Sequence, residues 1–166
     1  METIIANYKN LEGHNLFVKI VRILSVPALN TLPEIFLRRF MRNSSQDAEI
    51  VLDNVGSAQA LEVMYDRYRR NFFSRGVIQG LADLFWHHFV SQPKGVRNRL
   101  KIVENNLEKE ILRIINQNSE KRINFLTIGG GSARGIVEVL SKHSGELNGW
   151  EISVINVDKS LKAIEL

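Results

Sequence analysis

The chain contains no cysteine and no long apolar run, and each absence excludes a class of protein. Without cysteine, neither a disulfide framework nor a thiolate metal site can form. No apolar run reaches the roughly eighteen residues of a membrane-spanning helix, so no transmembrane segment is expected. The apolar residues near the start are interrupted by Asn7, Lys9, Glu12 and His14. That pattern predicts no secretory signal and a cytoplasmic location.

The composition is that of a globular protein, with 44% hydrophobic and 24% charged residues among 166. The formal net charge is +4, and the basic residues are spread over segments with helical periodicity. Such a spread favours a solvated surface over nucleic-acid binding. The chain has no internal repeat and no low-complexity tract.

The first 120 residues are predicted to be mostly helical. Apolar residues recur with helical spacing in the stretches 15–25, 32–41, 57–70, 77–90 and 96–116. Pro27 is expected to end the first helix, and Pro33 to lie in the first turn of the second. Ser45 is expected to cap a following helix. A break at Gln92–Gly95 should precede the longest helix, which has one apolar and one charged face.

The stretch Asn15–Arg42 combines an apolar and a basic face. The apolar side chains of its first helix are Leu16, Phe17, Ile20, Ile23 and Leu24, and the basic ones in the stretch are Lys19, Arg22, Arg38, Arg39 and Arg42. This pattern fits a buried helical hairpin, which we favour, or peripheral contact with an anionic membrane surface.

A histidine pair and a group of aromatic residues between positions 65 and 89 are interpreted as structural. His87 and His88 are adjacent, so on a helix they project about 100° apart and do not easily bind one metal ion. No metal site is therefore predicted. A core is also favoured over a base-stacking platform or a lid for the aromatic residues Tyr65, Tyr68, Phe72, Phe73, Phe85, Trp86 and Phe89.

At residue 123 the pattern changes to that of a strand. Ile123–Ile128 is a nearly continuous apolar run, typical of a central parallel strand covered on both faces. The glycine-rich loop Gly129–Gly135 follows. We then expect a helix over Ser132–Ser141, a strand over Trp150–Val157 and a helix over Lys159–Leu166. This β-α-β-α order is typical of a parallel, doubly wound sheet.

The glycine loop and Asp158 have the positions that a nucleotide-like ligand requires. Glycines let the backbone turn tightly beside a ligand, and the next helix offers free N–H groups. Asp158 follows the second strand, where nucleotide-binding folds place a carboxylate that accepts ribose hydroxyls. The alternatives are a turn that only permits close packing and, for Asp158, a helix N-cap.

The spacing of the glycines separates ligand classes. The dinucleotide pattern G-x-G-x-x-G needs a glycine where Arg134 stands, and the short-chain reductase pattern needs glycines at Ile128 and Arg134. Both patterns fail. The pattern G-x-G-x-[G/A] is met by Gly129, Gly131 and Ala133.

Phe125–Gly135, with Asp158 after it, resembles motif I and the following acidic position of class I S-adenosylmethionine-dependent methyltransferases. Gln92–Leu100, which leads through a long helix into the first strand, is similar to the lead-in of members with a helical N-terminal region. The resemblance covers about residues 92–166. In that family an Asp or Glu commonly stands where this chain has Thr127, whose hydroxyl cannot pair with the cofactor's amino group as a carboxylate would.

The resemblance implies an α/β fold with a mostly helical N-terminal region, residues 1–120, followed by the first β-α-β-α of a Rossmann-like parallel sheet, residues 121–166. It implies S-adenosylmethionine as cofactor and an unidentified methyl acceptor, and it assigns no catalytic residue. In the family the glycine loop packs against the methionine part of the cofactor and the acid binds its ribose. The implied cofactor-binding residues are Thr127, Gly129, Gly130, Gly131, Ala133, Asp158 and Lys159.

Two strands alone leave the edges of a parallel sheet unpaired. We therefore expect the natural chain to continue past Leu166, and the 166 residues alone to be inactive as an enzyme. Two other functions stay open: an NAD(P)-dependent reductase with a variant glycine loop, and a non-enzymatic helical adaptor.

Overall fold

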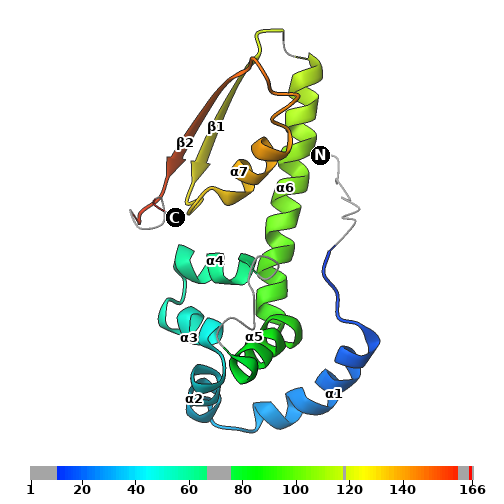
Figure 1. Ribbon diagram of the computed structural model, residues 1–166, viewed down its shortest axis with the longest axis vertical. Helices are drawn as coiled ribbons and strands as arrows, with labels where there is room; N and C mark the ends of the chain where they lie inside the picture. The colour runs from blue at the N-terminus through cyan, green and yellow to red at the C-terminus, as the bar shows by residue number, and fades with distance from the viewer. Residues whose placement is uncertain (1–10, 67–75, 118, 161–164, 166) are drawn as a thin grey trace, which may run out of the picture. The chain divides into compact units, whose positions relative to one another are not determined.

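The computed structural model describes residues 11–66, 76–117, 119–160 and 165 (Figure 1). The chain divides into two compact units, one of residues 12–98 and one that begins at Arg99 and contains the sheet. The boundary between the two units, at residues 98/99, lies inside the long helix that spans Ser91–Gln117. The boundary predicted from the sequence, where the helical pattern gives way to a strand pattern, is at residues 120/121. The α/β class with a helical majority is confirmed.

The unit of residues 12–98 is built from helices. They are α1 (Leu16–Asn30), α2 (Glu34–Ser44), α3 (Gln46–Asp53), α4 (Ala58–Tyr65), α5 (Val77–Phe89) and the first part of α6 (Ser91–Gln117). Helix α3 packs against α2, α4 and α5. The core of the unit consists of Ala48, Val51, Ala60, Val63, Met64 and Trp86.

Serine side chains cap the N-termini of two of these helices. The Ser45 hydroxyl accepts a hydrogen bond from the Ala48 N–H at 3.1 Å, which confirms the predicted cap. The Ser57 hydroxyl does the same for α4, from the Ala60 N–H at 3.2 Å. Each bond satisfies one of the four N–H groups that the first turn of a helix leaves without a partner. The predicted stretch 57–70 becomes α4, and its residues from 67 onward lie outside the described residues.

The predicted helix ends at prolines are wrong in two places. Helix α1 continues through Pro27 to Asn30, because the carbonyl of Ile23 that loses its N–H partner lies on an exposed turn, where water can bind it. Helix α6 begins at Ser91 and includes Pro93, since the missing proline N–H falls in the first turn, where it has no partner anyway. The break expected at Gln92–Gly95 is therefore absent. Pro33 lies one residue before α2 rather than inside its first turn.

The apolar face of α1 was expected to be buried, and it is exposed instead. Leu16, Phe17, Ile20, Ile23 and Leu24 all lie in contact with solvent, while Val18 is buried. The aromatic cluster is likewise split. Trp86 is in the core as predicted, Phe85 is exposed and stacks on Phe89 with ring centroids 4.5 Å apart, and Tyr68, Phe72 and Phe73 lie outside the described residues.

The second unit holds two parallel strands and the helix that connects them. These are β1 (Arg122–Ile128), α7 (Arg134–Lys142) and β2 (Glu151–Val157), with a register running from Arg122 opposite Glu151 to Ile128 opposite Val157. The predicted parallel pair is confirmed. Residues of the helix expected over 159–166 fall largely outside the described residues.

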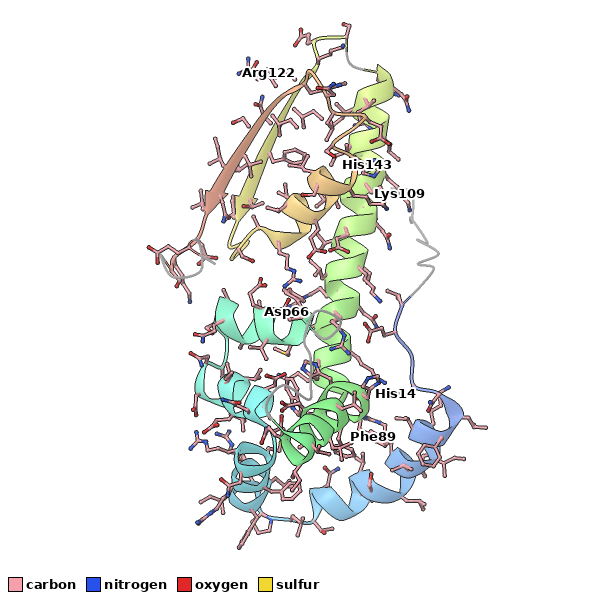
Figure 2. The ribbon with its side chains drawn as sticks, viewed as in Figure 1. His14, Asp66, Phe89, Lys109, Arg122 and His143 are labelled. Atoms are coloured by element: carbon pink, nitrogen blue, oxygen red, sulfur yellow. The ribbon has the colours of Figure 1, made fainter. Side chains whose placement is uncertain are left out.

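One face of the sheet is covered by α7 and by the second half of α6. Ile111 of α6, Ile123 of β1, Val139 of α7 and Leu147 form its buried core. Glu108 of α6 also binds Lys142 at 2.6 Å and His143 at 3.0 Å, and Figure 2 shows His143 beside α6. These two contacts hold the pKa of Glu108 below its ordinary value.

The other face of the sheet is open among the described residues. Leu126 and Ile128 of β1 and Ile155 and Val157 of β2 are all at least half exposed there. The expectation that β1 is covered on both faces is therefore wrong for this part of the chain. No helix among the described residues combines the length and the apolar character needed to cross a membrane.

Candidate cofactor-binding loop

The loop between β1 and α7 has a backbone that its glycines make possible. Gly129 and Gly131 have φ of +67° and +59°, in the left-handed region that side chains disfavour. Gly130 has an ordinary φ, but a Cβ there would lie 2.9 Å from the Cβ of Thr127. Conformation therefore favours glycine at two of these positions, and the close approach of the loop to the end of β1 requires the third.

Hydrogen bonds tie the loop to the end of β2. The Gly129 N–H donates to the carbonyl of Val157 at 2.7 Å, which extends the ladder of the sheet by one bond. The Gly131 carbonyl accepts from the Asn156 side-chain amide at 2.7 Å, and the Gly131 N–H donates to Oδ2 of Asp158 at 3.0 Å. Both polar backbone groups of Gly131 are thus held by side chains, one from Asn156 near the end of β2 and one from Asp158 directly after it.

Thr127 supports the same arrangement from β1. Its hydroxyl donates to Oδ1 of Asn156, its partner in the parallel register. Asn156 therefore lies between Thr127 and Gly131 and binds both. The Thr127 hydroxyl is used inside the protein, at the position where the resembling family carries an acid.

Asp158 uses both carboxylate oxygens. Oδ1 accepts from the Ser160 N–H at 2.9 Å, and Oδ2 accepts from Gly131. These two backbone donors, Ser160 first, lower the pKa of Asp158, so the group is ionised at neutral pH. The bond to Ser160 has the geometry of a cap or turn, and the bond to Gly131 joins the acid to the glycine loop. The sequence offered two roles for Asp158, a helix N-cap and an acceptor for ribose hydroxyls, and one side chain in this position can serve both.

The structure brings most of the predicted site residues together. Thr127, Gly129, Gly130, Gly131 and Asp158 lie within this hydrogen-bonded group or directly beside it. Ala133 precedes α7 with a left-handed φ of +52°, and its carbonyl accepts the N–H groups of Ile136 and Val137. Lys159 is exposed beside Asp158, whose pKa its charge also lowers.

Asn156 is the residue that sequence reasoning missed. A signal was present, because Asn156 is a polar residue in the otherwise apolar second half of β2. A buried or half-buried amide within such a strand needs a hydrogen-bond partner, and the loop supplies one.

A pair of carboxyl groups lies between α6 and α7. Glu104 of α6 contacts Glu138 of α7, and Arg134 at the start of α7 binds Glu138 at 2.7 Å. Burial, and then the hydrogen bond and charge of Glu138, raise the pKa of Glu104 to about 7. One turn away, a Cβ at Gly135 would lie 3.4 Å from Leu100, so Gly135 serves the close packing of α7 on α6.

In the unit of residues 12–98, buried polar side chains bind one another and nearby backbone carbonyls. Nε2 of His87 lies 2.9 Å from Oδ2 of Asp47, and the His87 side chain is fully buried. Arg97 of α6 binds the carboxylate of Glu12 at 2.8 Å and donates to the carbonyls of Met64 and His87. This confirms a structural role for His87. In the part of the chain that the structure describes, no three His, Cys, Asp or Glu residues are placed to hold a metal ion.

The arrangement of the loop suits a ligand with hydroxyl donors, since an ionised and partly exposed carboxylate stands against a glycine-rich backbone. Comparison with known proteins adds nothing to this geometry: no protein-family model, no curated protein and no solved structure matches the chain.

Proposed function

We propose that this chain is the cofactor-binding part of an S-adenosylmethionine-dependent methyltransferase with a Rossmann-like sheet, acting on an acceptor that remains to be identified. The observation that carries the proposal is the hydrogen bond from the Gly131 N–H to Asp158. It joins the glycine loop after β1 to the acid after β2, at the carboxyl ends of two parallel strands. Ligands of open α/β sheets bind at that edge.

Asp158 has acceptor capacity left for a ligand. A carboxylate offers about four lone-pair positions, and each of its oxygens accepts one backbone N–H here. Two vicinal ribose hydroxyls are donors of the right kind for the remaining positions. Because its pKa is lowered, Asp158 stays an acceptor throughout the neutral range.

The residues fit the ribose part of the cofactor and leave its amino group without an acidic partner at position 127. The Thr127 hydroxyl is bound to Asn156, so Thr127 supports the loop rather than the ligand. When bound, S-adenosylmethionine would supply the methyl group as an electrophile. Asp158 would bind its ribose, and Gly131 and Asn156 would keep the loop in shape beside it; orientation of this kind is the main requirement of an in-line transfer.

Calorimetric titration of the 166-residue chain tests the proposal with S-adenosylmethionine, S-adenosylhomocysteine, NADH and NADPH. We expect binding of the first two, and a loss of affinity of about tenfold or more in Asp158→Asn, because hydrogen bonds to a charged acceptor are stronger than those to a neutral one. Glu151→Gln is the matched control, since Glu151 is an exposed acid at the other end of β2. It should leave affinity unchanged.

Other results would replace the proposal. Binding of NADH or NADPH alone would favour a reductase with a variant glycine loop. Binding of none of the four ligands to a chain that circular dichroism shows to be folded would favour a non-enzymatic helical adaptor.

A further inference from the structure

The most apolar side of α1 faces solvent. Leu16, Phe17, Ile20, Ile23 and Leu24 are between 51% and 75% exposed. The side of α1 that packs inward carries Val18, which is buried, and Arg22, whose Nη1 donates to the carbonyl of Phe89 at 2.7 Å. Figure 2 labels Phe89 at the end of α5. The contact of Arg22 therefore fixes which side of α1 is turned outward.

Helix α2, next in the chain, repeats this arrangement. Ile35, Phe36 and Phe40 are between 64% and 75% exposed. Met41, on the opposite side, packs against the core of the unit. We call the eight exposed apolar side chains the α1–α2 face: Leu16, Phe17, Ile20, Ile23, Leu24, Ile35, Phe36 and Phe40. Exposed apolar side chains in this number on two successive helices indicate an interaction site.

The charge of the segment is strongly one-sided. Of the 22 basic and 18 acidic residues in the chain, five basic and one acidic lie in residues 15–43, which leaves 17 of each sign elsewhere. The segment therefore carries the whole formal excess of +4. Arg38 binds the single acid, Glu34, within α2, and Lys19 and Arg39 are exposed among the apolar side chains.

We infer that the α1–α2 face docks on the surface of an anionic lipid bilayer. Helices that lie in the headgroup region combine Phe, Leu and Ile on one side with Lys and Arg beside them, and they gain both apolar burial and attraction to anionic lipids. A second copy of the chain fits less well. A symmetric dimer apposes the same patch of both copies, and here it would bring the excess cations together.

This inference does not depend on the proposed function. The α1–α2 face belongs to the unit of residues 12–98, and the glycine loop belongs to the other unit. Lipid binding and cofactor binding can therefore succeed or fail separately, and each has its own measurement.

Flotation of the full chain with vesicles tests the inference. We expect it to bind vesicles of phosphatidylcholine with phosphatidylserine, not vesicles of phosphatidylcholine alone, and to be released by high salt. The double variant Lys19→Glu/Arg39→Glu should lower partitioning at least about tenfold, because each basic residue near an anionic surface contributes about a fivefold factor. The double variant Phe17→Ser/Phe36→Ser should also lose binding.

Two variants control for charge and for exposed apolar area. Lys109→Glu changes an exposed lysine of α6, and Val55→Ser removes an exposed apolar side chain between α3 and α4. Both should float like the unchanged protein. The inference is overturned if no vesicle is bound, if neutral vesicles are bound equally, or if the variants of the α1–α2 face bind as well as the controls. A dimer in sedimentation equilibrium that Phe17→Ser/Phe36→Ser dissociates would identify a second copy as the occupant and would also overturn it.

Discussion

Asn156 binds the carbonyl of Gly131 at 2.7 Å and accepts the hydroxyl of Thr127, so one side chain joins both strands to the glycine loop. The loop is therefore held in shape by the sheet itself. Asp158 completes the contact through the N–H of the same glycine. A loop fixed in this way needs little reordering when a ligand binds, and preorganisation of this kind reduces the free-energy cost of binding.

Replacement of Asn156 by alanine should loosen the loop. The substitution removes the donor to Gly131 and the acceptor for Thr127, and one lost hydrogen bond of this kind is worth about 1 kcal/mol. We expect amide hydrogen exchange at Gly131 to accelerate about fivefold. Ser153→Ala is the control, because Ser153 lies on the open face of the same strand. An unchanged exchange rate at Gly131 in Asn156→Ala would contradict the supporting role of Asn156.

Gly130 should tolerate no side chain. A Cβ at this position would meet the Cβ of Thr127 at 2.9 Å and its hydroxyl at 3.0 Å, and Thr127 is a backbone-anchored, β-branched residue that cannot move aside. We expect Gly130→Ala to lower the free energy of unfolding by about 1–3 kcal/mol, the range for overpacked sites. Urea denaturation measures this change.

Gly145→Ala provides the comparison for Gly130→Ala. Gly145 has an ordinary φ and nothing within 4 Å of an added Cβ. Alanine there should be neutral or stabilise the protein by up to about 1 kcal/mol, since it restricts the unfolded chain. Equal effects of the two substitutions would show that the loop does not approach Thr127 closely.

The sheet was predictable from the sequence because its signals are local. An apolar β-branched run, a glycine loop and a second run led to the parallel pair that the register confirms. The link between Gly131 and Asp158 follows from that topology, since both stand at the carboxyl ends of neighbouring strands. Asn156 was missed because a polar residue in an apolar strand indicates that a hydrogen-bond partner exists but not which one, and here the partner is 25 residues away.

The helical unit was predictable in its elements and not in its packing. Periodicity identifies an apolar side of α1 but does not say whether that side meets a core or a partner. Arg22 lies on the inward side together with the buried Val18, and its guanidinium donates to the carbonyl of Phe89. A long-range contact of this kind reversed the predicted orientation of the helix.

Arg97 should be essential to the unit of residues 12–98. It is nearly fully buried and pairs with Glu12, whose side chain is only 8% exposed, so removal of the arginine would leave a largely buried carboxylate without its counter-charge. We expect Arg97→Met to lower the free energy of unfolding by about 3–5 kcal/mol, the usual cost of breaking a buried ion pair from one side. Arg99→Met, two residues further on the exposed side of α6, should change it little.

The double variant Glu12→Gln/Arg97→Met separates the ion pair from the packing of Arg97. Removing both charges should recover part of the stability lost in Arg97→Met, because no charge is then left unpaired. Strict additivity of the two single substitutions in urea denaturation would show that the pair is not coupled.

Glu104 should make stability depend on pH near neutrality. Its pKa is raised from the ordinary 4.5 to about 7, mainly by burial and also by Glu138, so the folded protein holds a proton that the unfolded chain releases at lower pH. The folded state then binds more protons than the unfolded state between pH about 4.5 and about 7, and stability falls as pH rises through this window. Glu104→Gln keeps the hydrogen-bonding shape without the charge, so its melting temperature should exceed that of the unchanged protein at pH 8 and approach it at pH 5.

Glu110→Gln is the control for Glu104→Gln, because Glu110 is an exposed glutamate on the same helix. Its melting temperature should follow that of the unchanged protein at both pH values. Melting curves that fall equally with pH in Glu104→Gln and in the unchanged protein would assign the dependence to another group.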